Sequence, residues 1–130
     1  MQWQPFAVTG VLSASSANLL YPGTIASGVG WQNGGATNLQ GVACLVTHIR
    51  VLNNDSSTRT VSFAVGTTAV APSATNAVFF PLAYSLTAKT PYDWYGEVML
   101  FGTNTAHFLV GLADSANLVT YELDGEVGVA

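Results

Sequence analysis

Three carboxylates occupy every second position near the end of the chain, at Glu122, Asp124 and Glu126. Side chains two residues apart in a β-strand point to the same face of the sheet, so these carboxylates are predicted to share one face. A solvated outer face is the simplest interpretation. The alternative is a stripe that docks a partner and discourages the pairing of edge strands. Calcium binding is not favoured, because the spacing of an EF-hand loop is absent.

The two histidines, His48 and His107, each lie between residues that are expected to face the core, so both are predicted to point outward. A metal site needs two or three ligands that converge. Neither histidine has a ligand-type residue two positions away or in a local cluster. We therefore expect no metal site and no cofactor.

Nucleophilic catalysis is not indicated either. The single cysteine, Cys44, lies in an apolar run and is interpreted as a small buried hydrophobic residue. Serines occur in turn-like clusters, and no G-x-S-x-G motif is present. Residues 28–34 (GVGWQNG) have the spacing G-x-G-x-x-x-G, which is not the dinucleotide fingerprint, and no βαβ unit surrounds them. We expect that the protein is not an enzyme.

Three aromatic residues, Tyr92, Trp94 and Tyr95, follow one another closely in the segment 91–95 (PYDWY). If they were exposed beside Asp93, they would form a stacking platform of the kind that carbohydrate-binding modules use. Alternation along the strand instead places Trp94 on one face with Val98 and Leu100, which favours burial of Trp94 in the core. Both interpretations stay open at this point.

A period of two runs through most of the chain and predicts short strands separated by polar turns. The predicted strands are 6–12, 18–22, 43–53, 58–66, 77–80, 83–88, 94–101, 106–113 and 118–128. The strongest pair is expected to be a hairpin over 43–66, with Val51 opposite Val61 and Ile49 opposite Phe63. Its other face would carry His48, Arg50, Thr60 and Ser62. The predicted fold is all-β, a single antiparallel β-sandwich domain over 1–130, jelly-roll-like, with eight or nine short strands.

Composition narrows the class of protein. The 130 residues are 49% hydrophobic but only 8% charged, and the net charge is −4. Three cations cannot neutralise a track of phosphates, so nucleic acid is not an expected partner. No apolar run approaches the ~18 residues that a membrane span needs, and the start of the chain lacks the features of a secretory signal. A surface with so few charges suits a protein that packs against neighbours.

Five segments of this chain resemble a recurring pattern in small virion structural proteins of tailed bacteriophages. These proteins are of the head decoration and minor tail type. The five segments are, in order, 46–55 (VTHIRVLNND), 58–63 (TRTVSF), 84–89 (YSLTAK), 93–100 (DWYGEVML) and 118–127 (LVTYELDGEV). The resemblance covers roughly residues 43–130. It departs from the family where a glycine-rich insertion runs from Tyr21-Pro22-Gly23 to Gly41. Such proteins are β-sandwiches without catalytic residues.

The resemblance implies a non-enzymatic capsid decoration or cementing protein, made in the host bacterial cytoplasm and bound to the capsid surface of the virion. Its partners would be the major capsid protein and copies of itself, a homotrimer among the options. The alternatives are a tail, neck or fibre component, or a carbohydrate-binding module. The segment 1–41, with its glycine-rich loop at 26–41, is the candidate docking arm. The candidate interface residues are Trp3, Phe6, Trp31, Tyr92, Trp94, Tyr95, Glu122, Asp124 and Glu126.

Overall fold

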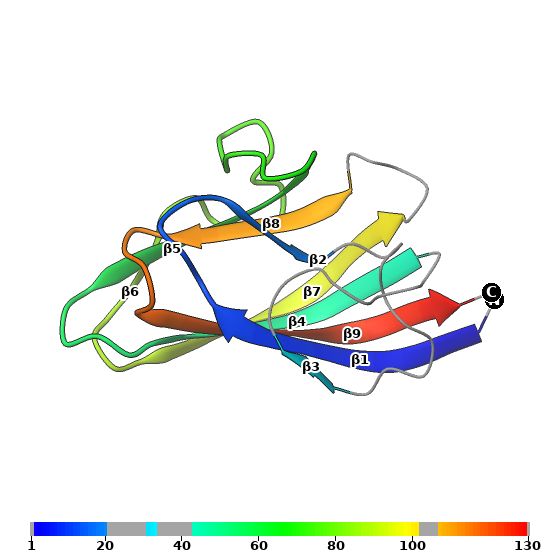
Figure 1. Ribbon diagram of the computed structural model, residues 1–130, viewed down its shortest axis with the longest axis horizontal. Helices are drawn as coiled ribbons and strands as arrows, with labels where there is room; N and C mark the ends of the chain where they lie inside the picture. The colour runs from blue at the N-terminus through cyan, green and yellow to red at the C-terminus, as the bar shows by residue number, and fades with distance from the viewer. Residues whose placement is uncertain (1, 21–30, 34–42, 102–106, 130) are drawn as a thin grey trace.

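The structure, a computed structural model, describes residues 2–20, 31–33, 43–101 and 107–129. These residues form nine strands and no helix, arranged as two sheets that face each other across one core (Figure 1). The strands are β1 (Gln2–Val11), β2 (Ala17–Leu20), β3 (Trp31–Asn33), β4 (Ala43–Asn53), β5 (Arg59–Gly66), β6 (Tyr84–Leu86), β7 (Pro91–Phe101), β8 (Phe108–Ala113) and β9 (Val119–Val129). The predicted antiparallel β-sandwich is confirmed.

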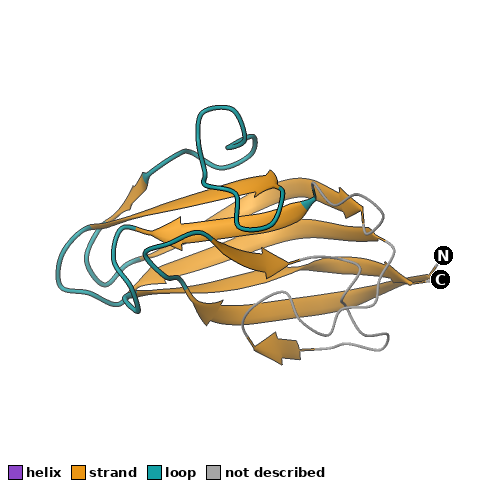
Figure 2. Ribbon diagram, turned by 45° about the horizontal axis from the view of Figure 1, so that its top comes forward, coloured by secondary structure: helices purple, strands orange, loops and turns teal. Residues whose placement is uncertain are grey.

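The larger sheet has the order β3-β1-β9-β4-β7 and the smaller one β2-β8-β5-β6. All pairings are antiparallel except that of the short edge strand β3 with β1. Figure 2 shows the two layers of strands from a second direction. The jelly-roll subtype stays a prediction, with which the orders β1-β9-β4-β7 and β2-β8-β5-β6 agree.

The core lies between the two sheets. Each long strand contributes to it the side chains on one of its two faces. Ile49 and Val51 from β4 and Val61 and Phe63 from β5 belong to this core, and all four are fully buried. Each such side chain contributes about 1.5–3 kcal/mol when removed from water. The alternating apolar positions in the sequence are therefore the positions that hold the sheets together.

The predicted hairpin over 43–66 is wrong. β4 pairs with β7 and β9, whereas β5 pairs with β6 and β8, so the two strands belong to opposite sheets. Ile49, Val51, Val61 and Phe63 are all buried, but they belong to one core between two sheets and not to one face of a ladder. Of the predicted outer-face residues, Ser62 is buried and its hydroxyl accepts a hydrogen bond from the Ala83 N–H at 2.8 Å.

The corner between β4 and β5 is built around Asn53, a fully buried side chain. Its amide donates to the carbonyls of Ser57 at 2.9 Å, Leu86 at 3.0 Å and Thr87 at 3.2 Å. Its side-chain oxygen accepts from the N–H of Asp55 at 2.9 Å. One polar side chain thus satisfies four backbone groups where the chain leaves one sheet for the other, which is how a buried amide becomes favourable.

Two further predictions differ from the structure. The segment 77–80 is not a strand, although Phe80 is buried and its ring meets that of Phe63 edge-on at 4.8 Å. Apolar content there reflects a loop that covers the core. The strand β3 lies within the predicted loop 26–41, and the rest of that loop is outside the described residues.

A β-bulge at Thr47 breaks the alternation that the sequence predicts along β4. Register shifts between Val46 and His48 in both ladders of this strand. A bulge adds one residue and restores a shared face on either side of it. As a result Leu45 and His48, three residues apart, both point away from the core, whereas Val46 and Ile49 are buried.

Candidate functional site

The side of the larger sheet that faces away from the core is called the outer face here. Residues directly opposite each other in a ladder point to the same side. One row across the outer face runs Ala7, Asp124, His48, Tyr95, and the next runs Thr9, Glu122, Arg50, Asp93. The pairing of β1, β9, β4 and β7 therefore brings together polar residues that are far apart in the chain.

His48 lies at the centre of these two rows, between two carboxylates. Its Nδ1 atom is 3.1 Å from Oδ2 of Asp124, and its Nε2 atom is 2.7 Å from Oδ1 of Asp93. The ring of Tyr95 stacks on the imidazole, with centroids 4.7 Å apart and planes 20° apart. A neutral imidazole has one N–H and donates to one carboxylate, whereas the imidazolium donates to both.

Arg50 completes the network on the side of β7. Its Nη1 atom donates to Oδ2 of Asp93 at 2.6 Å, so Asp93 holds both His48 and Arg50. We call His48, Arg50, Asp93, Asp124, Glu122 and Tyr95 the charged cluster. The ion pairs within it are partly exposed, and water screens their contribution to stability.

Burial, hydrogen bonds and neighbouring charges shift the pKa of three groups in the charged cluster. Burial lowers the pKa of His48, but hydrogen bonds and charges of Asp124 and Asp93 outweigh it, and the pKa is raised. Hydrogen bonding to His48, with further help from Arg50, lowers the pKa of Asp93. Burial, reinforced by the neighbouring Asp124, raises the pKa of Glu122. Glu122 and Asp124 therefore lie close enough to repel each other when both are ionised.

A groove of about 370 Å³ adjoins the charged cluster on the outer face. Arg50 and Glu122 form its polar wall. The remaining lining comes from the ends of β1, β4 and β9, namely Thr9, Gly10, Val11, Leu52, Thr120 and Tyr121. Glu122 is therefore accessible from a concave surface.

The opposite end of the outer face is apolar. One row runs Pro5, Glu126, Leu45, Met99, and the next runs Trp3, Gly128, Ala43, Phe101. We call Trp3, Pro5, Leu45, Met99 and Phe101 the apolar end. Trp3 is 41% exposed, Met99 38% and Phe101 47%. The two rows span four neighbouring strands, roughly 14 Å at the usual strand spacing.

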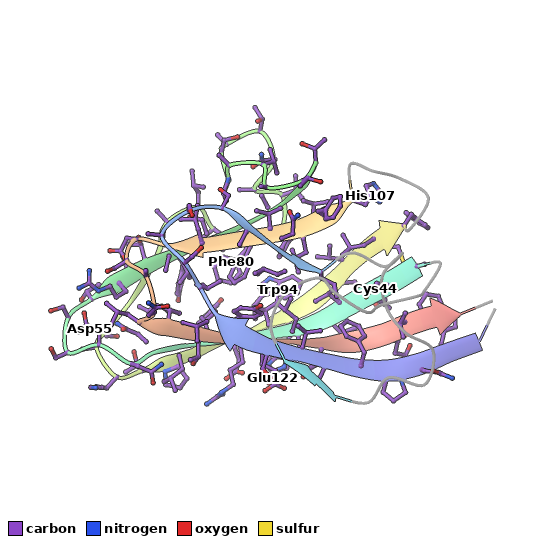
Figure 3. The ribbon with its side chains drawn as sticks, in the orientation of Figure 1. Cys44, Asp55, Phe80, Trp94, His107 and Glu122 are labelled. Carbon is purple, nitrogen blue, oxygen red and sulfur yellow. The ribbon has the colours of Figure 1, made fainter. Side chains whose placement is uncertain are left out.

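The predicted interface residues divide between the two sides of the larger sheet. Trp3, Tyr95, Glu122, Asp124 and Glu126 all point to the outer face, and the three carboxylates share one face as predicted. Figure 3 shows Glu122 on the side of this sheet that faces away from the smaller sheet, with Phe80 and Trp94 between the two sheets.

The other predicted interface residues point inward or have side chains that the structure does not describe. Phe6 is 3% exposed and belongs to the core, so its side chain is not available to an interface. Tyr92 and Trp94 pack against the core. The backbone of Trp31 pairs with Ala7 in β3, but its side chain is outside the described part of the structure.

The three-ring stacking platform considered for Tyr92, Trp94 and Tyr95 does not form. The ring of Tyr92 meets that of Tyr84 at 4.5 Å, and the ring of Trp94 meets that of Phe79 at 5.3 Å, both on the core side. Tyr95 is 73% exposed on the outer face. Successive residues of a strand alternate in direction, so Trp94 and Tyr95 point to opposite sides.

The structure also places the cysteine and the two histidines. Cys44 is fully buried, and burial raises the pKa of its thiol. Nδ1 of His107 accepts a hydrogen bond from the Phe101 N–H at 3.1 Å, at the end of β7. His48 points outward, as expected.

The absence of ligand-type partners near His48 was inferred from its local sequence, and for that reason the charged cluster was missed. Its members come in three pairs spaced by two, His48 with Arg50, Asp93 with Tyr95, and Glu122 with Asp124. Each pair signals a shared face on its own strand. Only the order of the strands in the sheet brings the three pairs into contact.

Comparison of the chain with protein-family models, with curated proteins and with solved structures gave no match. Among the described residues, no helix is long and apolar enough to cross a membrane.

Proposed function

We propose that this chain is a non-enzymatic structural protein of a bacteriophage virion that binds the outer surface of the head shell as a decoration or cementing protein. The apolar end of the outer face is the single observation that carries this proposal. It presents Trp3, Met99 and Phe101 to solvent on one side of a sheet whose other side is already buried in the core.

The character of the apolar end supports a protein contact. Contiguous exposed apolar side chains rimmed by polar residues mark interaction sites, and aromatic residues and methionine are enriched at the centres of interfaces. Glu126 lies between Pro5 and Leu45 in the same row, and the charged cluster borders the patch along β4, β7 and β9. A small apolar centre with a charged margin suits a surface that docks on a folded partner.

The resemblance of residues 43–130 to phage virion proteins supports the identity of that partner as the major capsid protein. Attachment at many equivalent sites on a shell lets individually weak contacts add up by avidity. A sandwich with 8% charged residues suits crowding beside copies of itself, a homotrimer among the arrangements. A tail, neck or fibre position in the same particle would use the same contact at a lower copy number.

Sedimentation of the purified chain with phage heads that lack it tests the proposal. The double variant Met99→Ser/Phe101→Ser removes two exposed apolar side chains from the apolar end, and we expect it to bind at least about tenfold more weakly. The matched control is Val78→Ser/Leu82→Ser, which removes two exposed apolar side chains from the loop between β5 and β6 and should bind as the parent does.

Circular dichroism and thermal unfolding would establish that both double variants are folded, since exposed substitutions change stability by only about 0.5 kcal/mol. Equal binding by the parent and the Met99→Ser/Phe101→Ser variant would overturn the assignment of the apolar end. Failure of the parent chain to bind heads at all would overturn the proposed function.

A further inference from the structure

We propose that His48, Asp124 and Glu122 form a binding site for one divalent transition-metal ion of the zinc type, with Asp93 holding the imidazole from the other side. This inference concerns the charged cluster and stands apart from the proposed role in the virion. Local sequence patterns do not indicate such a site, because its residues come from two strands that are far apart in the chain.

The three side chains bring one nitrogen and two oxygen ligands close together. Their ligand atoms all lie within 4.8 Å of one another. Zinc binds imidazole nitrogen and carboxylate oxygen at roughly 2.0–2.2 Å, so two ligand atoms on one ion are roughly 3 to 3.5 Å apart. The 3.1 Å between Nδ1 of His48 and Oδ2 of Asp124 already has that value.

The opposite side of the imidazole has the arrangement that supports a metal ligand. A metal-bound histidine nearly always donates its other ring N–H to a carboxylate, which fixes the tautomer and the direction of the free lone pair. Nε2 of His48 lies 2.7 Å from Asp93, and Asp93 is itself held by Arg50 at 2.6 Å. An Nε2–H donated to Asp93 leaves the lone pair of Nδ1 directed toward Asp124.

Tyr95 fixes the remaining freedom of the ring. Its side chain stacks on the imidazole at 4.7 Å, so rotation of His48 away from Asp124 would break that contact. Asp93, Arg50 and Tyr95 lie on β4 and β7, whereas Asp124 and Glu122 lie on β9. The support for the histidine is thus independent of the two carboxylate ligands.

The local charge also favours a cation. With a neutral His48, the carboxylates of Asp93, Asp124 and Glu122 face one guanidinium, that of Arg50, which leaves an excess of two negative charges. A divalent ion compensates that excess. Glu122 lines the groove, so an ion held there keeps positions open to water or to a further ligand.

Titration calorimetry of the tag-free chain with zinc chloride near neutral pH, after treatment with a chelator, tests the site. We expect one ion per chain with an affinity in the micromolar range and a thermal midpoint that rises with zinc. Magnesium, which prefers oxygen ligands and octahedral geometry, should not produce either effect. Cobalt(II) provides an optical check, because its visible absorption reports tetrahedral nitrogen and oxygen ligation.

Two variants test ligands of the ion, and a third tests the residue that positions the imidazole. His48→Gln and Glu122→Gln should each abolish zinc binding or weaken it more than about tenfold, and Asp93→Asn, a positioning residue, should weaken it by about 10–100-fold. His107→Gln is the matched control, since it removes the other histidine and should leave affinity and cobalt absorption unchanged. Circular dichroism of each variant separates loss of the ion from loss of the fold.

Two results would overturn the proposal. One is the absence of both a binding heat and a change in thermal midpoint when zinc is added to the parent chain. The other is zinc binding that survives in His48→Gln or that disappears in His107→Gln. Neither outcome bears on the sedimentation experiment with phage heads, which depends on residues at the other end of the outer face.

Discussion

Gly125 of β9 packs directly against the carbonyl oxygen of Leu45 in β4, so closely that an added Cβ would overlap that atom. This contact lies beside the bulge at Thr47, where the ladder between β4 and β9 changes register. The glycine lets the two backbones approach at the point where β4 gains its extra residue. Beyond that point the side chains of β4 on the outer face, His48 included, owe their orientation to this bulge.

The first prediction concerns the bulge. Gly125→Ala should lower the free energy of unfolding by about 1–3 kcal/mol or more, because the new methyl group meets backbone and no flexible side chain is available to yield. Urea denaturation measures the change. The control is Glu126→Ala, at the next position along β9, where the side chain is exposed. It should change the free energy of unfolding by only about 0.5 kcal/mol. Equal stability of the two variants would contradict the role assigned to the glycine.

The second prediction concerns the buried amide at the corner between β4 and β5. Asn53→Ala should cost about 3 kcal/mol of unfolding free energy, because it leaves the carbonyls of Leu86 and Thr87 and the N–H of Asp55 without their partner. The neighbouring Asn54→Ala is the control, since that side chain is exposed and its hydrogen bonds are long, at 3.4 Å. Chemical denaturation of both variants should show a large loss of stability for Asn53→Ala and a small one for Asn54→Ala.

The third prediction concerns the pH dependence of the free energy of unfolding under acid conditions. Two hydrogen bonds lower the pKa of Asp55. The more important one comes from the Arg59 side chain, and the other comes from the Ser56 N–H. A carboxyl whose pKa is lower in the folded state stabilises the fold at pH values above its unfolded pKa, and that contribution is lost as the pH falls through the folded pKa. The parent chain should therefore lose its advantage over Asp55→Asn as the pH falls below about 4, the ordinary pKa of an aspartate.

Urea midpoints of the parent chain and Asp55→Asn across that pH range provide the measurement. Glu97→Gln is a useful reference, because it removes an exposed carboxylate for which the structure gives no ion pair among the described residues. At neutral pH its urea midpoint should lie closer to that of the parent than the midpoint of Asp55→Asn does, because it breaks no ion pair. A gap between the parent chain and Asp55→Asn that stays constant with pH would contradict the assigned role of the Arg59 ion pair.

The class of fold could be predicted from the sequence because it depends on local patterns. Alternation such as Ile49 with Val51, and Val61 with Phe63, identifies strands with one buried side, and polar turns between them indicate a sandwich. Strand pairing could not be predicted in the same way. The short loop after Asn53 favoured a hairpin, yet the side-chain amide of Asn53 holds a turn that carries the chain to the other sheet.

The candidate site was predicted only in part for the same reason. The shared face of Glu122 and Asp124 follows from their spacing within one strand and is confirmed. The contact of His48 with Asp93 and Asp124 requires β4 to lie between β7 and β9, and those residues are 45 and 76 positions away along the chain. No local pattern carries that information.

The most direct measurement is quantitative mass spectrometry of purified phage particles that encode this chain, with its copies counted against those of the major capsid protein. The account predicts a ratio close to that of the shell protein itself, as a decoration protein bound at repeated sites would give. A handful of copies per particle would contradict binding over the head shell and would place the chain in the tail or neck. Complete absence from the particle would contradict the virion account.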